Sequence, residues 1–320
     1  MSEVGQLLAE RKRTGSKRGH REDDAHLALV LEGGGMRGVV SIGMASVFEE
    51  RGYFDAFDSV HGSSAGACGG AYFVARQSSL GASIYYEDIN NTEFIDLKRP
   101  LFGRPIMNRA FLVDHVMQHV KPLAAELIVG APGFLNVVVT SADTGEGMVV
   151  NTFRSRDHLF DVLRATICLP VIAGRDSMID GRRFVDGGLA QQIAIPSAIE
   201  AGATHVVALM TRAADETERK VRGGSDFQAQ VLSFVYGKRV RDAYIARNPK
   251  INALISAIEV GRVVHDARSI EVDGVIRPSS SGKAGRLTVD GERLRRVCQE
   301  SRAAALKYLE TSATSKVQKS

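Results

Sequence analysis

Three short stretches of this sequence contain the residue types that acyl hydrolysis requires. They read Gly33-Gly34-Gly35-Met36-Arg37-Gly38, Gly62-Ser63-Ser64-Ala65-Gly66 and Asp186-Gly187-Gly188. Backbone amides of a glycine loop can stabilise an anion, a serine hydroxyl can attack a carbonyl carbon, and a carboxylate can accept the proton. The combination predicts a serine hydrolase.

The serine stretch has the spacing of a nucleophile elbow, G-x-S-x-G. Gly62 and Gly66 flank Ser64 at the two positions where a side chain would crowd a sharp turn from strand to helix. Ser63 is off the central position, which makes Ser64 the predicted nucleophile. The pattern alone also fits a glycine-rich turn with an incidental serine. A short strand ending at residues 60–61 and a helix of small residues after the turn favour the elbow.

The glycine loop follows an apolar strand at residues 27–31 and precedes a helix at 39–50. Its amides are therefore expected at a helix N-terminus, where negative charge is favoured, and we expect them to stabilise an oxyanion. Arg37 is interpreted as pairing with a carboxylate to hold the loop. Contact with a lipid phosphate is the alternative for this side chain.

The same loop also suggests a nucleotide site. Gly33, Gly35 and Gly38 match the dinucleotide fingerprint G-x-G-x-x-G. That motif needs an acidic residue at the end of the second strand, whereas this strand ends in His61 and the elbow. Dinucleotide binding is therefore the less favoured interpretation.

A serine nucleophile needs a base. The usual triad order would supply His205 or His265, but His205 lies in an apolar strand run and His265 lies in the C-terminal region. His61 would share its strand with Ser64. A partly desolvated carboxylate has a raised pKa and can accept the proton directly, so Asp186 is the preferred base. A plain Asp-Gly turn is its structural alternative.

Alternating strands and helices predict an α/β fold with a mostly parallel sheet covered on both faces. Asp180-Gly181 predicts a tight hairpin that ends just before Asp186, and Asp273-Gly274 predicts a second hairpin. Further elements are expected as strands at 136–140, 148–153 and 204–210, and as helices at 108–120, 157–168, 196–202, 226–248, 252–260 and 291–309.

The composition fits one large α/β core or two modest ones. Apolar residues make up 44% of the 320 residues and charged residues 24%, and the net charge is +4 from 41 basic and 37 acidic residues. The small, scattered excess of basic residues argues against nucleic-acid binding. Three cysteines, without zinc-type spacing, predict a reducing compartment and no metal site. The sequence shows no secretion signal and no apolar run long enough to span a membrane, so we expect a cytoplasmic protein.

The composition and the predicted elements divide the chain into three parts. Residues 1–25 are expected to be a basic, disordered tail, 26–212 the hydrolase domain, and 213–320 a mainly helical extension packed on or beside it. The tail contains a basic run from Arg11 to Arg21, which is interpreted as solvated. Peripheral contact with the anionic inner face of a membrane is the alternative for this run. The sequence gives no indication of the oligomeric state.

Taken together, these residues resemble the patatin-like phospholipases, whose signature is this glycine loop, a G-x-S-x-G elbow and a downstream D-G-G or D-G-A. The resemblance covers about residues 27–210, including Leu163-Arg164-Ala165-Thr166 and Pro170, with Thr166 where the family often has serine. It implies a three-layer α/β/α fold and a dyad of Ser64 as nucleophile and Asp186 as proton acceptor. The implied oxyanion hole is formed around Gly33, Gly34, Gly35, Arg37 and Gly38, with Gly187 and Gly188 in the acid loop.

The resemblance also implies a function. Family members hydrolyse acyl esters of phospholipids, lysophospholipids or neutral glycerides, so an acyl lipid is the expected partner, and no metal or organic cofactor is required. A lid is expected around residues 85–108, where the composition is irregular. A non-catalytic lipid-binding module on the same fold is the main alternative, and the intact Ser64 and Asp186 argue against it. A nucleotide-binding oxidoreductase is the weaker one.

Overall fold

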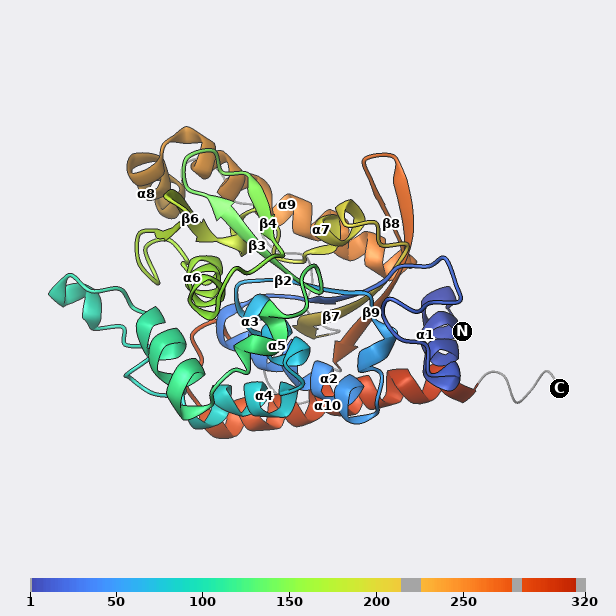
Figure 1. The fold of residues 1–320 in the computed structure, drawn as a ribbon. Coiled ribbons are helices and arrows are strands. Elements are labelled where there is room, and N and C mark those ends of the chain that lie inside the picture. The colour runs from blue at the N-terminus through green and yellow to red at the C-terminus, as the bar shows by residue number, and fades with distance from the viewer. Residues whose placement is uncertain (1, 214–225, 278–283, 315–320) are drawn as a thin grey trace.

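A single mixed sheet organises the chain (Figure 1). The computed structural model describes residues 2–213, 226–277 and 284–314. Within them the strand order is β5-β6-β3-β2-β1-β7-β9-β8, and β4 pairs with β3. The strands are β1 Leu27–Leu31, β2 Ser59–Ser63, β3 Leu135–Ser141, β4 Gly147–Val150, β5 Ser177–Ile179, β6 Arg182–Asp186, β7 His205–Ala213, β8 Arg262–His265 and β9 Arg268–Arg277.

The centre of the sheet is parallel, and both its faces are covered. β1 pairs in parallel with β2 and β7, so that Val30 lies opposite His61 on one side and Ala208 on the other. Leu29 of β1 packs into the core beneath α2, α3 and α10, whereas Val30 packs into the core beneath α7 and α9. This alternation along one buried strand confirms the predicted three-layer α/β/α arrangement.

The predicted helices occur in the predicted order, with shifts at their ends, whereas the helices at Glu3–Thr14, Ser78–Glu87 and Ala125–Val129 are not among the predicted elements. They are α1 Glu3–Thr14, α2 Gly38–Glu50, α3 Ala65–Val74, α4 Ser78–Glu87, α5 Ala125–Val129, α6 Arg156–Thr166, α7 Ile195–Glu200, α8 Phe227–Tyr236, α9 Lys238–Val260 and α10 Gly291–Thr314, with 3₁₀ turns at Gly35–Arg37, Phe54–Ala56, Arg99–Phe102 and Gly187–Leu189. The helix predicted at 108–120 is a π-helix over Phe111–Val120. The break predicted at 248–252 is wrong, because the helix pair divides at Gly237 (φ +87°) and α9 continues through Pro249.

One predicted hairpin is confirmed and the other is misplaced. Asp180 and Gly181 form the turn between β5 and β6, both with positive φ. In contrast, Asp273-Gly274 lies inside β9, and the turn between β8 and β9 is formed by Asp266-Ala267. A Cβ atom at Gly274 would come 2.6 Å from Ile258 of α9, so this glycine permits close helix packing and makes no turn.

The described part of the C-terminal extension is built into the same fold. β9 adds to the sheet by parallel pairing with β7, and Val206 lies opposite Val272. α10 packs along α2, and its Leu294 and Val297 are buried in the core beneath the sheet. The sheet therefore continues past the boundary predicted at residue 212.

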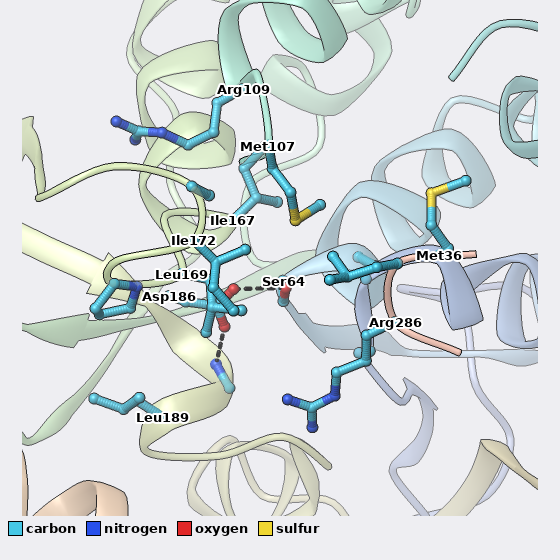
Figure 2. Close-up of a pocket in the computed structure, with 18 of the residues that line it drawn as sticks. Met36, Ser64, Met107, Arg109, Ile167, Leu169, Ile172, Asp186, Leu189 and Arg286 are labelled. Carbon is cyan, nitrogen blue, oxygen red and sulfur yellow. Dashed lines mark hydrogen bonds between the residues drawn. The ribbon is translucent and has the colours of Figure 1, made fainter. Parts of the chain in front are cut away.

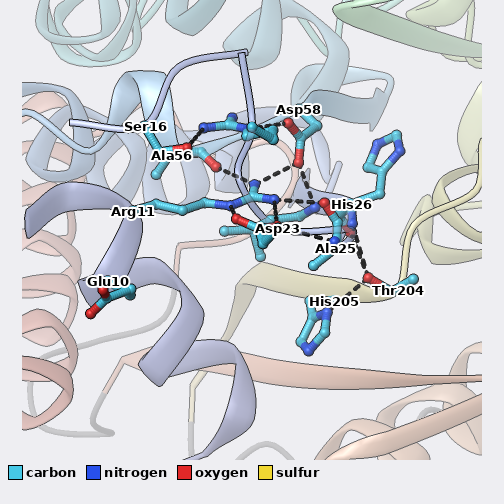
Figure 3. A network of polar contacts seen from close by, with 12 residues as sticks. Glu10, Arg11, Ser16, Asp23, Ala25, His26, Ala56, Asp58, Thr204 and His205 are labelled. Atoms are coloured by element: carbon cyan, nitrogen blue, oxygen red, sulfur yellow. Dashed lines mark hydrogen bonds and ion pairs between the residues drawn. The ribbon is translucent and has the colours of Figure 1, made fainter. Parts of the chain in front are cut away.

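The expectation of a disordered N-terminal tail is wrong for the helix α1. Arg11 is 2% exposed and pairs with Asp23 and Asp58, each at 2.6 Å (Figure 3). Arg21 pairs with Asp58 at 2.7 Å, and Arg18 lies over the ring of Phe134. Basic side chains that looked free in the sequence are held by acids and carbonyls outside their own run. In the described part of the chain, no helix is long and apolar enough to cross a membrane.

Candidate active site

Ser64 occupies a strained turn between β2 and α3. Its φ of 53° and ψ of −132° lie in a region that L-residues rarely adopt, at a cost of about 1–3 kcal/mol. A Cβ atom at Gly62 would come 2.6 Å from the backbone of Gly66, and one at Gly66 would come 2.2 Å from the carbonyl oxygen of Leu31. Both glycines of the predicted elbow are therefore required by close backbone contact.

The structure brings Ser64 and Asp186 together. The Ser64 Oγ donates a hydrogen bond of 2.7 Å to Asp186 Oδ2, and the amide of Gly188 donates one of 2.7 Å to Oδ1 (Figure 2). Asp186 ends β6, which pairs with β3, and a Cβ atom at Gly187 would come 1.9 Å from the carbonyl oxygen of Val138. The glycines after the acid therefore let this loop turn tightly against β3 and direct an amide to the carboxylate.

The environment of Asp186 suits a proton acceptor. Its side chain is buried, and burial raises the pKa of this carboxyl above its ordinary value. The hydrogen bonds from Ser64 and Gly188 and the charges of Arg286 and Arg247 oppose that rise in pKa. A raised pKa makes the ionised carboxylate a stronger base than a solvated aspartate, while these donors and charges favour its ionised form.

Thr166 holds the backbone of Ser64 in place. Its Oγ1 accepts a hydrogen bond of 2.8 Å from the amide of Ser64 and donates one of 2.6 Å to the carbonyl oxygen of Val138. From the sequence alone, this residue is only a departure from the family pattern. A threonine has the same hydroxyl as a serine, so the replacement retains the bridge between α6 and the elbow.

Two amides of the glycine loop donate no hydrogen bond to any of the described residues. The amide of Gly33 donates to the carbonyl of Gln192, that of Met36 to the carbonyl of Arg286, and that of Arg37 to Gly34. Gly38 caps the 3₁₀ turn with its amide. Across the described residues, the amides of Gly34 and Gly35 make no such bond, and both residues line the cavity beside Ser64.

Arg37 lies near a carboxylate and a hydroxyl that hold the glycine loop in place, in agreement with the interpretation that it pairs with a carboxylate. Its Nη2 lies 3.8 Å from Glu32 Oε1 and donates a 3.2 Å hydrogen bond to Thr211 Oγ1. Glu32 is fully buried and also accepts hydrogen bonds from the Gln192 side chain and the Thr211 amide. The guanidinium and its carboxylate thus tie the glycine loop to β7.

The histidines considered as bases lie elsewhere. His61 is buried between Ser59 and Ser197, and burial together with the charge of His26 lowers its pKa to about 3. His205 contacts the Thr204 hydroxyl at 2.8 Å, and His265 lies on β8 near Glu200. None of the described residues that line the cavity is a histidine. The geometry favours a direct contact between serine and carboxylate.

A cavity of about 270 Å³ opens over this pair. One part of its wall is apolar and comes from α4, the Phe94–Met107 segment, the π-helix and the loop after α6. These side chains are Tyr85, Ile89, Phe94, Met107, Leu112, Ile167, Leu169, Pro170, Val171, Ile172 and Ala173. The stretch predicted as a lid thus supplies part of the wall. Sequence reasoning missed the loop at 167–173 and the C-terminal residues Arg247 and Arg286, because long-range packing alone brings them here.

The residues described do not form a metal centre. No group of three or more His, Cys, Asp or Glu side chains in residues 2–213, 226–277 and 284–314 is placed to hold a metal ion.

Comparison with known proteins identifies the class that this fold and site define. The profile of the patatin-like phospholipase family matches residues 29–199, more than half of the chain, so the chain belongs to that family. The match contains the glycine loop, the elbow and the Asp186 loop, and it ends within α7. The resemblance stated from the sequence is thereby confirmed.

Individual relatives are distant. The uncharacterized protein YjjU of Escherichia coli K12 is 28% identical over 189 residues, which are 58% of this chain and 52% of that protein. Patatin-like phospholipase domain-containing protein 2 of Homo sapiens is 27% identical over 174 residues, covering 52% of this chain and 32% of that one. The matches thus span about half of the first relative and a third of the second.

Solved structures give weaker similarity. Human GIVD cytosolic phospholipase A2, solved with methyl gamma-linolenyl fluorophosphonate, is 10% identical with a TM-score of 0.49, covering 97% of this chain and 63% of that one. VipD from Legionella pneumophila is 12% identical with a TM-score of 0.36, covering 90% and 67%. Membership of this family suggests a lipid acyl hydrolase.

Proposed function

We propose that this protein hydrolyses carboxylic esters of acyl lipids through a dyad of Ser64 and Asp186. The observation that carries the proposal is the 2.7 Å hydrogen bond from the Ser64 hydroxyl to a buried carboxylate at the wall of an apolar cavity. The cavity suits an acyl chain, and the strained elbow holds the hydroxyl where an ester carbonyl can reach it.

The reaction follows from the positions of these groups. Ser64 Oγ attacks the ester carbonyl carbon as Asp186 accepts the hydroxyl proton. The carbonyl oxygen becomes an oxyanion, which the amides of Gly34 and Gly35 stabilise; a single donor of this kind contributes about 3–4 kcal/mol to the transition state. The intermediate collapses, the C–O bond to the alcohol breaks, and the alcohol leaves with the proton from Asp186.

Deacylation repeats the same steps with water. Asp186 accepts a proton from a water molecule, whose oxygen attacks the acyl carbon on Ser64. The second oxyanion forms at the same amides, and its collapse releases the fatty acid as Ser64 Oγ regains the proton from Asp186. The carboxylate thus serves as base and then as acid in each half of the cycle.

The alternatives from the sequence are less favoured. A non-catalytic lipid-binding module would not need the strained Ser64 or the buried Asp186, each of which costs stability. A dinucleotide site would need an acid after the second strand, whereas β2 leads into Ser64. A cytoplasmic location with contact to the inner membrane face remains part of the proposal.

The test is hydrolysis of a p-nitrophenyl ester of a short acid and of a phospholipid by wild type, Ser64→Ala and Asp186→Asn. We expect wild type to turn over at least one substrate and both variants to lose about 10⁴-fold or more in kcat. Circular dichroism checks that all three are folded. Ser63→Ala is the matched control and should keep activity. Residual turnover by Ser64→Ala near the wild-type rate would refute the dyad.

A further inference from the structure

Arginine side chains also line the cavity, and two of the three come from the C-terminal part of the chain. Of the described residues that line the cavity, three are arginines and one, Asp186, is acidic. Arg109 turns its guanidinium away from Ser64 toward the carbonyl of Arg164 (Figure 2). Arg286 lies on the other side of the Ser64–Asp186 pair from Met107 in this view, and Arg247 also lines the cavity.

Arg286 has little to balance its charge. Its side chain donates one hydrogen bond of 2.9 Å, to Gln192 Oε1, and forms no ion pair with any carboxylate of the described residues. Burial and the neighbouring charges of Arg247 and Arg37 lower its pKa to about 10, against the weaker opposite effect of Asp186 and Glu32. A largely desolvated guanidinium without a carboxylate is costly, and an anionic ligand group would remove that cost.

We propose that Arg286, with Arg247 beside it, binds an anionic head group of the substrate, so that the preferred substrate is an acyl ester bearing a phosphate close to the scissile bond. This inference rests on the proposed function. The apolar side chains of residues 85–112 and 167–173 accept the acyl chain, and in Figure 2 Ser64 lies between Met107 and Arg286. The phosphate would bind the guanidinium group of Arg286 through paired N–H···O bonds.

The test compares two esters with the same acyl chain, 1-acylglycerol 3-phosphate and 1-acylglycerol, in uncharged detergent micelles. For Arg286→Gln we expect the ratio of their kcat/KM values to fall at least tenfold toward the neutral ester, with partial recovery in Arg286→Lys. Arg293→Gln, an exposed arginine at the start of α10, should keep the wild-type ratio. A third ester with a carboxylate in place of the phosphate shows whether phosphate is required or any anion suffices.

The outcomes separate this inference from the proposed function. An unchanged ratio in Arg286→Gln overturns the anion site and leaves the dyad intact. If the wild type hydrolyses none of the esters, the proposed function is refuted. The anion site is then tested by measuring the Kd of 1-acylglycerol 3-phosphate for Ser64→Ala. We expect the Kd of the double variant Ser64→Ala with Arg286→Gln to be at least tenfold higher than that of Ser64→Ala. An equal Kd for the two variants overturns the proposal.

A second surface, independent of the dyad, projects beyond the same cavity. The 3₁₀ turn Arg99–Phe102 stands out at the left of Figure 1, and Leu97, Leu101 and Phe102 are 68%, 82% and 78% exposed. Three large apolar side chains at one protruding tip are unusual for a surface in contact with water. Lys98 and Arg104 are exposed beside them.

Hydrogen bonds hold the tip on residues 92–96 and 106–108, a pair of segments called the stalk here, which continues into the cavity wall. Ile95 and Met107 form a bridge, and the amide of Asn108 donates to the carbonyl of Phe94. The guanidinium of Arg99 donates to four carbonyls of this stalk, those of Thr92, Glu93, Phe94 and Ile106. Phe94 and Met107 both line the cavity.

From this arrangement we infer that residues 97–104 dock on an anionic bilayer surface, with the apolar tip inserted among the acyl chains and Lys98 and Arg104 at the phosphates. The stalk then places the cavity wall close to the bilayer surface. A partner protein could cover an apolar tip, but the exposed basic pair beside it matches an anionic lipid surface.

Vesicle cosedimentation tests the docking of residues 97–104 on a bilayer. All variants carry Ser64→Ala, so that the vesicle lipids are not hydrolysed. On vesicles of phosphatidylcholine with phosphatidylglycerol, we expect Leu101→Asp with Phe102→Asp to lower the bound fraction at least tenfold. Val260→Asp changes an equally exposed apolar residue at the end of α9 and should bind as the parent does. Equal binding of the tip variant, or absence of binding by the parent, would overturn the inference.

Discussion

Arg11 and Arg286 are both arginines withdrawn from water, and their surroundings differ in a way that separates structure from function. Arg11 makes five hydrogen bonds, to two carboxylates and two carbonyls (Figure 3). Burial alone would lower its pKa, but the bonds to Asp23 and Asp58 outweigh burial and raise it. Arg286 has a single side-chain bond and a lowered pKa. Arg11, whose charge is balanced by carboxylates, holds α1 against the sheet. Arg286, whose side chain has one hydrogen bond and no carboxylate partner among the described residues, lines a cavity.

The same contrast holds for the acids. The carboxylate of Asp58 accepts hydrogen bonds from Arg11, Arg21 and the amide of Leu27. Asp186 accepts from one hydroxyl and one amide in a buried position that raises its pKa. The N-terminal network therefore favours stability, whereas in the proposed mechanism the Asp186 site gives up stability for reactivity.

The largest expected effect comes from breaking the N-terminal network. Arg11→Ala leaves Asp23 and Asp58 without their shared partner and should lower the free energy of unfolding by about 3–5 kcal/mol, measured by urea denaturation. Arg13→Ala removes an exposed pair with Glu10 and should change it by less than about 1 kcal/mol. Similar effects of the two changes would refute the assigned role of Arg11.

Next in size is the loss of the Thr166 bridge. Thr166→Val removes the acceptor of the Ser64 amide and the donor to Val138, and should lower kcat by about 10- to 100-fold, equivalent to about 1–3 kcal/mol. Thr166→Ser retains the hydroxyl and should stay near wild type. Ester hydrolysis measures both, and equal losses would show that the methyl group matters more than the hydrogen bonds.

A smaller effect is expected on stability at Asp186. Because the folded state raises the pKa of this carboxyl, its stabilising contribution is present below the unfolded pKa and is lost as the pH rises through the folded pKa. Asp186→Asn should therefore raise the free energy of unfolding at pH 8 by roughly 1 kcal/mol, with no gain at pH 3. Urea unfolding at both pH values measures this, and destabilisation at pH 8 would contradict it.

The smallest effect expected is a shift in pH dependence. With Asp186 as base, kcat/KM rises with pH through the pKa of its carboxyl, above the range of a solvated aspartate. The positive charge of Arg286 lowers that pKa, so Arg286→Gln should move the acid limb to higher pH. The profile is measured with the neutral ester. A shift to lower pH would show that the two side chains do not interact as described.

Local patterns predicted the elbow turn and the β5–β6 hairpin correctly because the constraints on both turns are local. Gly62 and Gly66 are dictated by a turn of five residues, and Asp180-Gly181 by a two-residue hairpin. The role of Asp186 was predicted from its residue type and companion motifs and stays a prediction until activity is measured.

Features set by distant contacts were not predictable in the same way. The basic run looked solvated because the partners of Arg11 include Asp58, 47 residues away. Gly274 looked like a turn residue because its contact with α9 is invisible in the sequence. Arg286 joins the site only because its segment lies against the glycine loop, where its carbonyl accepts the Met36 amide.

The most direct test of the account is covalent labelling with an alkyl fluorophosphonate, followed by peptide mass spectrometry. Attack by Ser64 Oγ on phosphorus expels fluoride and leaves a stable phosphonyl ester. We predict one label per chain on the peptide containing Ser64, no label in Ser64→Ala, and labelling at least about 100-fold slower in Asp186→Asn. Labelling of another residue, or equal rates in wild type and Asp186→Asn, would contradict the dyad.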